Sequence, residues 1–284
     1  MLKERILSAT VLLFIFSVTF FSKNPTYFLF LIFILSGILF YELEKILKLK
    51  SLALIIYWIL SFTPIIFFYL IISLDINILD VQNQDLKNFL NIFSILICVI
   101  SLIFWLVLAP IDIKYKKISS NVKFKIFYGY FLITPMVIAT SIVFIQNKTL
   151  LLIPFTMIWV ADICAYFIGK NFGKNKLAKS ISPGKTIEGA LGGLVCNIIY
   201  AYFLSYYSEV DFNVMFFFAL IVTTLSIFGD IYESFLKRQA NVKDSGSIIP
   251  GHGGLLDRLD SFCPTLPLCY LAFIFFNTFI TPIS

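Results

Sequence analysis

The sequence predicts an all-α, polytopic integral membrane protein with about nine transmembrane helices. Of its 284 residues, 60% are hydrophobic and only 13% are charged, whereas soluble domains average about 45–50% apolar and about 25% charged residues. So few charges cannot cover a soluble core of this size. This excludes a soluble enzyme, a disordered chain, a secreted disulfide scaffold and a nucleic-acid-binding domain. Only helices or closed barrels satisfy the backbone in lipid. Runs such as 11–16 and 216–221 are continuously apolar and do not alternate as barrel strands do.

Nine stretches have the length and composition of a membrane helix, which needs about 20 mostly apolar residues. We expect the first to be a retained helix and not a cleaved signal peptide, because its long apolar run ends at 18–22 without a small-x-small cleavage site. In chain order, the expected spans are residues 5–22, 26–44, 52–73, 88–109, 124–146, 150–169, 187–207, 213–235 and 264–281.

The distribution of basic residues predicts the orientation. With the N-terminus in the cytoplasm and nine spans, 19 of the 22 Lys and Arg residues fall on the cytoplasmic side, and Lys23, Lys87 and Lys148 fall on the other. Because short cytoplasmic loops carry an excess of Lys and Arg, we expect a cytoplasmic N-terminus and an external C-terminus. The same orientation makes the polar connections 170–186 and 236–263 cytoplasmic.

The two halves of the chain differ in character. Residues 1–150 are expected to form about five transmembrane helices with short loops, and 151–284 a C-terminal catalytic transmembrane region that holds nearly all the unusual polar residues. The five Cys lie in or beside apolar runs and there is one His. A His/Cys zinc site therefore has almost no ligands to use.

Asp162 lies inside one of the apolar stretches, where a carboxylate is expensive and usually functional. A structural pair with a nearby Lys is the alternative explanation. Around it, Ala161, Ala165, Gly169 and Gly173 recur every four residues. Such a stripe of small residues is most simply explained by close packing against another helix.

A second segment carries a Gly-Lys-Thr triplet at 184–186. It is not a P-loop, because the glycine that motif requires five residues before Gly184 is Lys179 here, and no preceding strand is expected. We expect instead that the Ser-Pro-Gly turn opens a helix, whose N-terminus favours anions. Ser182, Lys185 and Thr186 are therefore candidates to bind phosphate, Lys185 through a charge-assisted contact.

Polar side chains gather most densely between residues 226 and 260. One face of a helix, with residues three or four apart, is predicted to hold Ser226, Asp230, Glu233 and Lys237. Asp257 and Asp260 are three residues apart on a helix that follows a Gly-rich turn. Carboxylates that converge from two helices suit a magnesium ion bound to phosphates, because this ion takes one or two carboxylates and fills its shell with water and substrate oxygens.

Charge pairs at the membrane boundary are the alternative explanation for these carboxylates, and it stays open for Glu233 and Asp244. His252 is the single His and is flanked by glycines. It could contact a phosphate, act as an acid, or hold the loop in shape, and the sequence leaves the three roles open.

These residues resemble the bacterial phosphatidate cytidylyltransferases, also called CDP-diglyceride synthases. The family signature stands here, without departure, as Ser234-Phe-Leu-Lys237-Arg238, Lys243-Asp244 and His252-Gly-Gly-Leu-Leu-Asp257-Arg258-Leu-Asp260. The Ala-Asp-x-x-Ala-Tyr segment around Asp162 and the Ser-Pro-Gly-Lys-Thr-x-Glu-Gly segment that contains Glu188 are also similar to the family. The resemblance covers about 159–261.

The resemblance implies transfer of the cytidylyl group of CTP to phosphatidic acid, which gives CDP-diacylglycerol and pyrophosphate in phospholipid biosynthesis. It also implies dependence on Mg²⁺, with a second cation left open, a homodimer, and a bacterial inner-membrane location. The active site is then expected to face the cytoplasm, with no nucleic acid as partner.

The candidate residues fall into three groups. The expected catalytic residues are Asp230, Asp257, Lys237, Arg258 and His252, of which Asp230 and Asp257 are the expected metal ligands. The expected phosphate-binding residues are Lys185, Ser182, Thr186, Arg238 and Lys243. The expected supporting residues are Asp162, Glu188, Glu233, Asp244 and Asp260.

Two other functions remain as alternatives. A related CTP-dependent lipid enzyme with a polyprenol or archaeal ether-lipid substrate is disfavoured only by the signature. A transporter of anionic metabolites would use intramembrane Asp residues and broken helices, but it predicts two similar halves with matched Gly/Pro breaks. Nearly all the polar motifs here lie in the C-terminal half.

Overall fold

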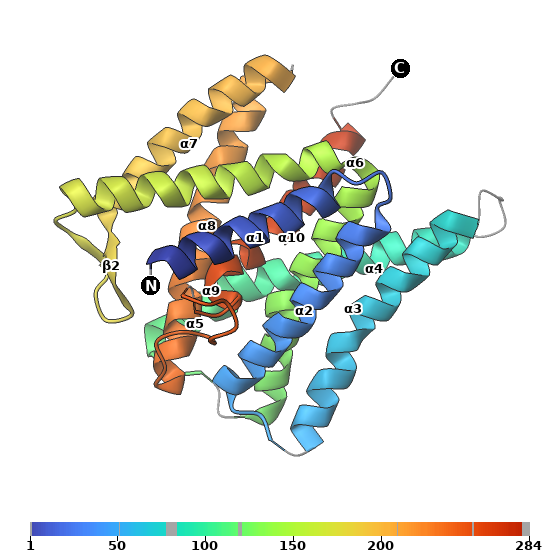
Figure 1. Cartoon of the computed structure of the whole chain (residues 1–284), viewed down its shortest axis with the longest axis horizontal. Coiled ribbons are helices and arrows are strands. Elements are labelled where there is room, and N and C mark those ends of the chain that lie inside the picture. Colours follow the sequence, from blue (N-terminus) through green and yellow to red (C-terminus); the bar gives the residue numbers. More distant parts are fainter. Residues whose placement is uncertain are drawn as a thin grey trace.

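A computed structural model describes residues 2–50, 52–77, 84–118, 121–208, 210–251 and 253–279. The described chain is almost entirely helical (Figure 1). In order, its elements are α1 (Leu2–Phe20), α2 (Thr26–Leu47), α3 (Leu52–Asn77), α4 (Gln84–Ile103), a π-helical turn η2 (Phe104–Leu108), α5 (Ala109–Tyr115), α6 (Val122–Phe172), β1 (Lys176–Ala178), β2 (Ser182–Thr186), α7 (Ile187–Ser208), α8 (Phe212–Ala240), α9 (Leu256–Leu259) and α10 (Phe262–Phe279).

In the part of the chain that the structure describes, helices cover the expected membrane stretches except for residues 21–22 of the first, and residues 280–281 of the last lie outside that part. Within the described residues, five helices are long and apolar enough to cross a bilayer: Thr26–Leu47, Asn88–Tyr115, Val122–Phe172, Ile187–Ser208 and Phe212–Ala240. Shorter apolar helical stretches run over Leu52–Ile66 and Phe262–Phe275. The predicted all-α membrane class is confirmed, while the count of nine spans and the division at residue 150 stay predictions.

Helix α6 joins two of the expected spans in one element of 51 residues. It bends at Asn147, whose backbone is extended (φ −159°, ψ 100°). The Asn147 side chain accepts a hydrogen bond from the Thr149 amide at 2.9 Å, so it caps the second half. Figure 1 shows the two halves running in different directions. The bend lets one helix serve both the centre of the bundle and the polar site.

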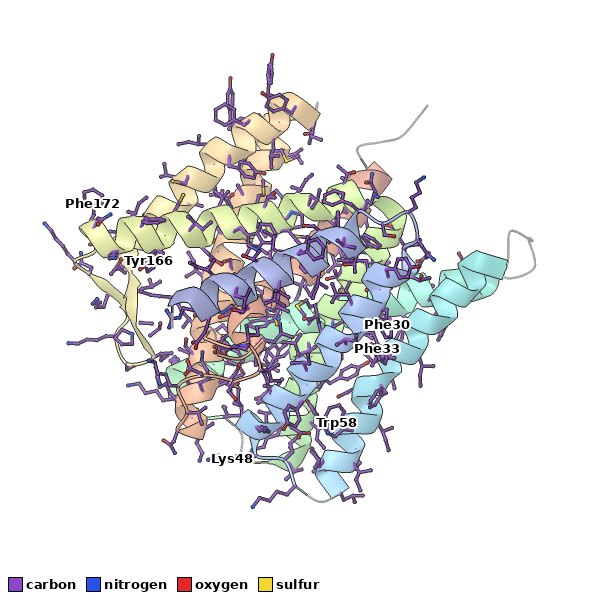
Figure 2. All side chains as sticks on the ribbon, in the orientation of Figure 1. Phe30, Phe33, Lys48, Trp58, Tyr166 and Phe172 are labelled. Carbon is purple, nitrogen blue, oxygen red and sulfur yellow. The ribbon has the colours of Figure 1, made fainter. Side chains whose placement is uncertain are left out.

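Apolar side chains cover the outside of the bundle as well as its core. Phe30, Tyr166 and Phe172, labelled in Figure 2, are each more than half exposed. Large side chains such as Trp105 and Tyr232 fill the interior. A soluble protein rarely exposes so much apolar surface, so this exterior suits contact with lipid.

The segment before α7 differs from the sequence prediction. Residues 182–186 form β2, which pairs antiparallel with β1, and the turn between them lies earlier, at 179–181. The expectations of no strand and of a Ser-Pro-Gly turn opening the helix were therefore wrong. Both strands of a two-stranded sheet are edge strands, so the missing N–H of Pro183 is tolerated. Lys179 still departs from the P-loop spacing.

Small residues bring α6 and α7 close together. A Cβ placed on Gly189 would lie 2.7 Å from the carbonyl oxygen of Ala165, and one on Gly193 would lie 2.7 Å from that of Ala161. The two backbones are thus in direct contact, as expected when small residues repeat every four positions. This confirms that the small-residue stripe of α6 serves packing, and it fixes Asp162 of α6 next to the hairpin and α7.

Candidate functional site

A polar pocket of about 880 Å³ brings together residues from the segment around Asp162, the Gly-Lys-Thr segment and the polar region 226–260. Its walls come from α6, the β1–β2 hairpin, α7, α8 and the segment around α9. Its charged and hydroxyl-bearing lining residues are Asp162, Tyr166, Lys170, Lys176, Ser182, Lys185, Thr186, Asp230, Asp257, Arg258, Asp260 and Ser261. Opposite charges therefore face one another across a cavity of nucleotide size.

Asp230 of α8 forms an ion pair across the pocket with Lys185 of β2. The Lys185 Nζ to Asp230 Oδ2 distance is 2.7 Å, and the two side chains are 24% and 37% exposed. Ser234, one turn further along α8, donates a 3.4 Å hydrogen bond to the other oxygen of Asp230. The carboxylate is thus held in place but remains open to the pocket.

Asp257 of α9 is more tightly held. Its Oδ1 accepts a hydrogen bond from Lys237 Nζ at 2.6 Å, and its Oδ2 accepts from the amides of Ser245 at 3.0 Å and Gly254 at 2.9 Å. Burial alone would raise the pKa of Asp257, but the hydrogen bond and charge of Lys237 and the two amides outweigh it and lower the pKa below its ordinary value. Asp257 is therefore an anion that also shapes the loop before it.

Two further aspartates line the pocket. Asp162 accepts hydrogen bonds from Ser226 at 2.9 Å and from Ser261 at 3.4 Å. Burial and the negative charges of Asp230 and Glu233 raise the pKa of Asp260 well above its ordinary value. The site therefore concentrates carboxyl groups to a degree that favours a bound cation.

Several of the predicted site residues do not line the pocket within the described part of the chain. Lys237 lies between Asp257 and Glu233, paired with both. Arg238 donates to the carbonyl oxygens of Ile181 at 3.4 Å and Val242 at 3.3 Å. The exposed Lys243 and Asp244 are also absent from the pocket wall in the part of the chain that is described. Their assignment as substrate ligands or supporting residues stays a prediction.

The hairpin residues divide into pocket and scaffold. Ser182 and Lys185 line the pocket. Thr186 lines it too and caps α7, because its Oγ1 accepts a 3.1 Å hydrogen bond from the Gly189 amide. Glu188 accepts hydrogen bonds from the backbone amides of Lys174 and Asn175, which ties the start of the hairpin to α7. His252 lies outside the described residues.

The pocket's donor set fits a magnesium ion that shares its shell with substrate. No group of three His, Cys, Asp or Glu residues within the described ranges could hold a metal ion by itself. Magnesium needs only one or two carboxylates when phosphate oxygens and waters complete an octahedral shell. Asp230 and Asp257 both reach the pocket wall and can supply them.

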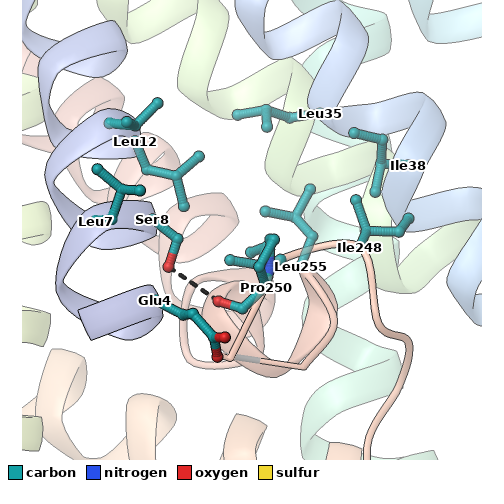
Figure 3. A pocket seen from close by; sticks show the side chains of 11 residues that line it. Glu4, Leu7, Ser8, Leu12, Leu35, Ile38, Ile248, Pro250 and Leu255 are labelled. Carbon is teal, nitrogen blue, oxygen red and sulfur yellow. Dashed lines mark hydrogen bonds between the residues drawn. The ribbon is translucent and has the colours of Figure 1, made fainter. Parts of the chain in front are cut away.

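An apolar cavity of about 170 Å³ adjoins the polar pocket. Side chains of α1, α2, α6 and α10 line it, including Phe16, Leu35 and Trp159. Arg258 lines both this cavity and the polar pocket. A further apolar cavity of about 390 Å³, shown in Figure 3, lies between α1, α2 and residues 248–255 and also has Leu35 in its wall.

Two buried carboxylates of the N-terminal half were missed by the sequence analysis. Glu42 on α2 is fully buried and bonded to the loop that precedes α9. Asp112 on α5 accepts a 2.9 Å hydrogen bond from Tyr232, on the same helix as Asp230. The signal was present in both cases, because each acidic residue interrupts or ends an apolar stretch, as Asp162 does.

The chain is similar to known proteins over nearly its whole length. The family model described as "Cytidylyltransferase family" matches residues 3–276. A Haemophilus influenzae protein named phosphatidate cytidylyltransferase is 33% identical over 297 aligned residues, which cover 97% of this chain and 99% of that protein. Proteins of the same name from Staphylococcus haemolyticus and Staphylococcus aureus are 48% and 49% identical over 128 residues, about half of each protein.

Proposed function

The chain belongs to the cytidylyltransferase family, and from this premise we propose how its pocket works. The protein transfers the cytidylyl group of CTP to phosphatidic acid, producing CDP-diacylglycerol and pyrophosphate for phospholipid biosynthesis. It is a nucleotidyltransferase within the membrane, and its substrates differ sharply in polarity. The site must therefore hold a water-soluble triphosphate and a membrane lipid side by side.

The observation that carries this assignment is the position of Arg258. Its side chain lines both the charged pocket and the apolar cavity between α1, α2, α6 and α10. A lipid phosphate bound at Arg258 has acyl chains that can continue into apolar surroundings, while the charged pocket accepts the nucleotide. A guanidinium binds phosphate oxygens in a bidentate manner, which suits the boundary between headgroup and tail.

The reaction needs positioning and charge neutralisation more than proton transfer. The lipid phosphate oxygen attacks the α-phosphorus of CTP, and pyrophosphate leaves on the opposite side. A phosphate monoester is already ionised near neutral pH, so a general base is not required. Lys185 and Arg258 line the pocket and would offset the repulsion between the two anionic substrates.

We assign a Mg²⁺ site to Asp230 and Asp257. A bound magnesium ion supplies electrostatic stabilisation of the negative charge on the phosphate oxygens. The Lys185 contact with Asp230 and the Lys237 contact with Asp257 hold these carboxylates in position. Lys185 can then exchange its carboxylate partner for a substrate phosphate.

The location and assembly are proposed on separate grounds. We propose that the protein crosses the bacterial inner membrane several times, with its N-terminus in the cytoplasm, and works as a homodimer. In Figure 1 the N-terminus, the hairpin and α9 lie toward one side, and the α1–α2 connection lies toward the other. The charged pocket therefore lies on the same side as the N-terminus, where the 19 basic residues are predicted to gather.

A direct assay tests the function. Purified protein in detergent with phosphatidic acid and CTP labelled at the α-phosphate should form labelled CDP-lipid and an equal amount of pyrophosphate, and EDTA should stop the reaction. A polyprenyl phosphate and an archaeal ether-lipid phosphate serve as competing substrates. Faster turnover of either than of phosphatidic acid would overturn the substrate assignment.

The meeting of the two cavities at Arg258 has its own test. Leu35→Trp narrows the apolar side, because Leu35 lines both apolar cavities. We expect it to raise the KM for dipalmitoyl phosphatidic acid at least threefold, while the KM for CTP and for the dihexanoyl lipid stay near wild type. Phe30→Trp, on the exposed face of the same helix, is the matched control. Equal effects on long and short chains would contradict an acyl-chain role for this cavity.

A further inference from the structure

Glu42 is a fully buried acidic residue on α2, a helix of the N-terminal half that lies outside the family signature. Its relative exposure is 0%, and it lies within the apolar span Thr26–Leu47. A buried carboxylate is strongly unfavourable unless hydrogen bonds replace its hydration. The partners of Glu42 therefore indicate why it is there.

Among the described residues, three hydrogen bonds reach the Glu42 carboxylate, and they come from the segment that carries the signature. Its Oε2 accepts from the Ser245 hydroxyl at 2.9 Å and from the Leu256 amide at 2.8 Å. Its Oε1 accepts from the Leu255 amide at 3.0 Å. Glu42 thus connects the two ends of the loop 245–255 to each other and to α2.

The loop is shaped to receive this carboxylate. A Cβ on Gly246 would lie 2.6 Å from Glu42 Oε1, and a Cβ on Gly254 would lie 2.6 Å from Oε2. A real Cβ does not approach an oxygen so closely, so both positions need glycine for close approach. Gly246 and the signature residue Gly254 therefore let the backbone close around an acidic side chain from another helix.

The contacts of Glu42 interlock with those of Asp257. Ser245 donates its hydroxyl to Glu42 and its amide to Asp257. Gly254 donates its amide to Asp257, and the next two amides belong to Glu42. Two carboxylates from different parts of the chain therefore hold four residues between them and share Ser245, immediately before Asp257 and Arg258 enter the pocket.

Helix α1 holds the far end of the loop. Arg5 Nε donates to the Gly251 carbonyl at 2.8 Å, and the Ser8 hydroxyl donates to the Pro250 carbonyl at 3.1 Å. The Ser8 contact is drawn in Figure 3. These contacts are exposed, whereas those of Glu42 are buried. Glu42 is therefore the main link between the N-terminal helices and the signature loop.

We propose that Glu42 is a positioning residue for the cytidylyl transfer. It holds the start of α9 so that Asp257 and Arg258 face the pocket together, and it acts through the loop without touching substrate. The inference rests on the proposed function for its kinetic readout, but the loop geometry can be measured without turnover.

The test compares Glu42→Gln with Glu44→Gln. Glu44 lies on the same helix, is partly buried and is bonded to Trp58 of α3, away from the loop, so it controls for the replacement of a hydrogen-bonded carboxylate in α2. An amide at position 42 keeps the shape but places an NH₂ group against one set of backbone donors. We expect Glu42→Gln to lower kcat at least tenfold per folded molecule, with the KM for CTP changed less than threefold. Glu44→Gln should stay within twofold of wild type in both.

Hydrogen exchange provides a readout that does not need activity. Amides of Leu255 and Leu256 should exchange at least tenfold faster in Glu42→Gln than in wild type or Glu44→Gln, measured well below the thermal midpoint of each protein. If kcat of Glu42→Gln matches that of Glu44→Gln, or if activity falls only in proportion to folded protein, the positioning role is wrong. The two proposals can fail separately. If wild-type protein makes no CDP-lipid but Glu42→Gln still exchanges faster at Leu255 and Leu256, the proposed function is wrong and the anchoring of the loop by Glu42 is supported.

A second variant covers poor folding of Glu42→Gln. Ser245→Ala removes one donor and leaves Glu42 its two amide partners. We expect a three- to tenfold loss of kcat with faster exchange at Leu255. Wild-type kcat in Ser245→Ala, together with unchanged exchange, would overturn the proposal.

Discussion

Replacing Asp230 with Asn separates a catalytic role from a stabilising one. In the structure the carboxylate pairs with Lys185 at 2.7 Å, and both side chains keep contact with solvent. Exposed ion pairs contribute about 0–1 kcal/mol to stability. Asp230→Asn should therefore lower the free energy of unfolding by no more than about 1 kcal/mol by this measure.

The expected effect on turnover is much larger. If the carboxylate binds Mg²⁺ that neutralises the phosphates in the transition state, its loss should lower kcat at least a hundredfold, which corresponds to about 2.7 kcal/mol. Native proteins have a free energy of unfolding of about 5–15 kcal/mol, so a loss of about 1 kcal/mol leaves most molecules folded. The two effects therefore differ enough to be told apart in one preparation.

The assay measures initial rates of CDP-lipid formation over a series of Mg²⁺ concentrations, alongside thermal unfolding in the same detergent. The double variant Asp230→Asn, Lys185→Met is the control for the ion pair. Because Lys185 is itself proposed to bind phosphate, this control is read from thermal unfolding: once the first change has removed the ion pair, the second should add little further destabilisation. Turnover of Asp230→Asn within threefold of wild type at every Mg²⁺ concentration would refute the metal assignment.

Three further outcomes are expected. Asp257→Asn should also abolish turnover, but with a lower thermal midpoint, because Asp257 holds Lys237 and two loop amides; an unchanged midpoint in thermal unfolding would contradict its loop role. Arg258→Lys should lose most activity in steady-state assays, since an ammonium cannot form the bidentate contact. Wild-type rates in this variant would contradict the assignment of Arg258 as a phosphate ligand. A cysteine substituted for Lys23 should react with a membrane-impermeant thiol reagent added outside, and a cysteine substituted for Lys116 should react only from the cytoplasmic side. The reverse pattern would contradict the proposed orientation.

The sequence by itself predicted the features that depend on local pattern. Long apolar runs specify membrane helices, because a helix satisfies its own backbone in lipid, and the nine stretches are helical over nearly all of their described residues. Spacing of three and four residues predicted that Ser226, Asp230, Glu233 and Lys237 share one helix, and all four lie on α8. The isolated acidic residue Asp162 was predicted as a supporting residue, and it lines the same pocket as Asp230.

Local pattern was less informative where backbone pairing or polar partners came from elsewhere. Residues 182–184 were predicted as a turn that opens a helix, but residues 182–186 form a strand, because β1 supplies the pairing. Lys237 was predicted as a catalytic residue, and in the structure it lies between Glu233 and Asp257. The choice among several carboxylates and lysines depends on which side chains the packed helices bring within reach.

What only the tertiary structure decided is how the two halves of the chain cooperate. The sequence shows Glu42 as one acidic residue in an apolar helix, more than two hundred positions from the loop it binds. It likewise cannot show that Arg258 lines a charged pocket and an apolar cavity at once. The length and hydrophobicity of a segment determine whether it enters the membrane, but these properties do not distinguish one span from another. The pairing of particular helices is determined instead by close packing at small residues and by the few buried polar groups that must find partners.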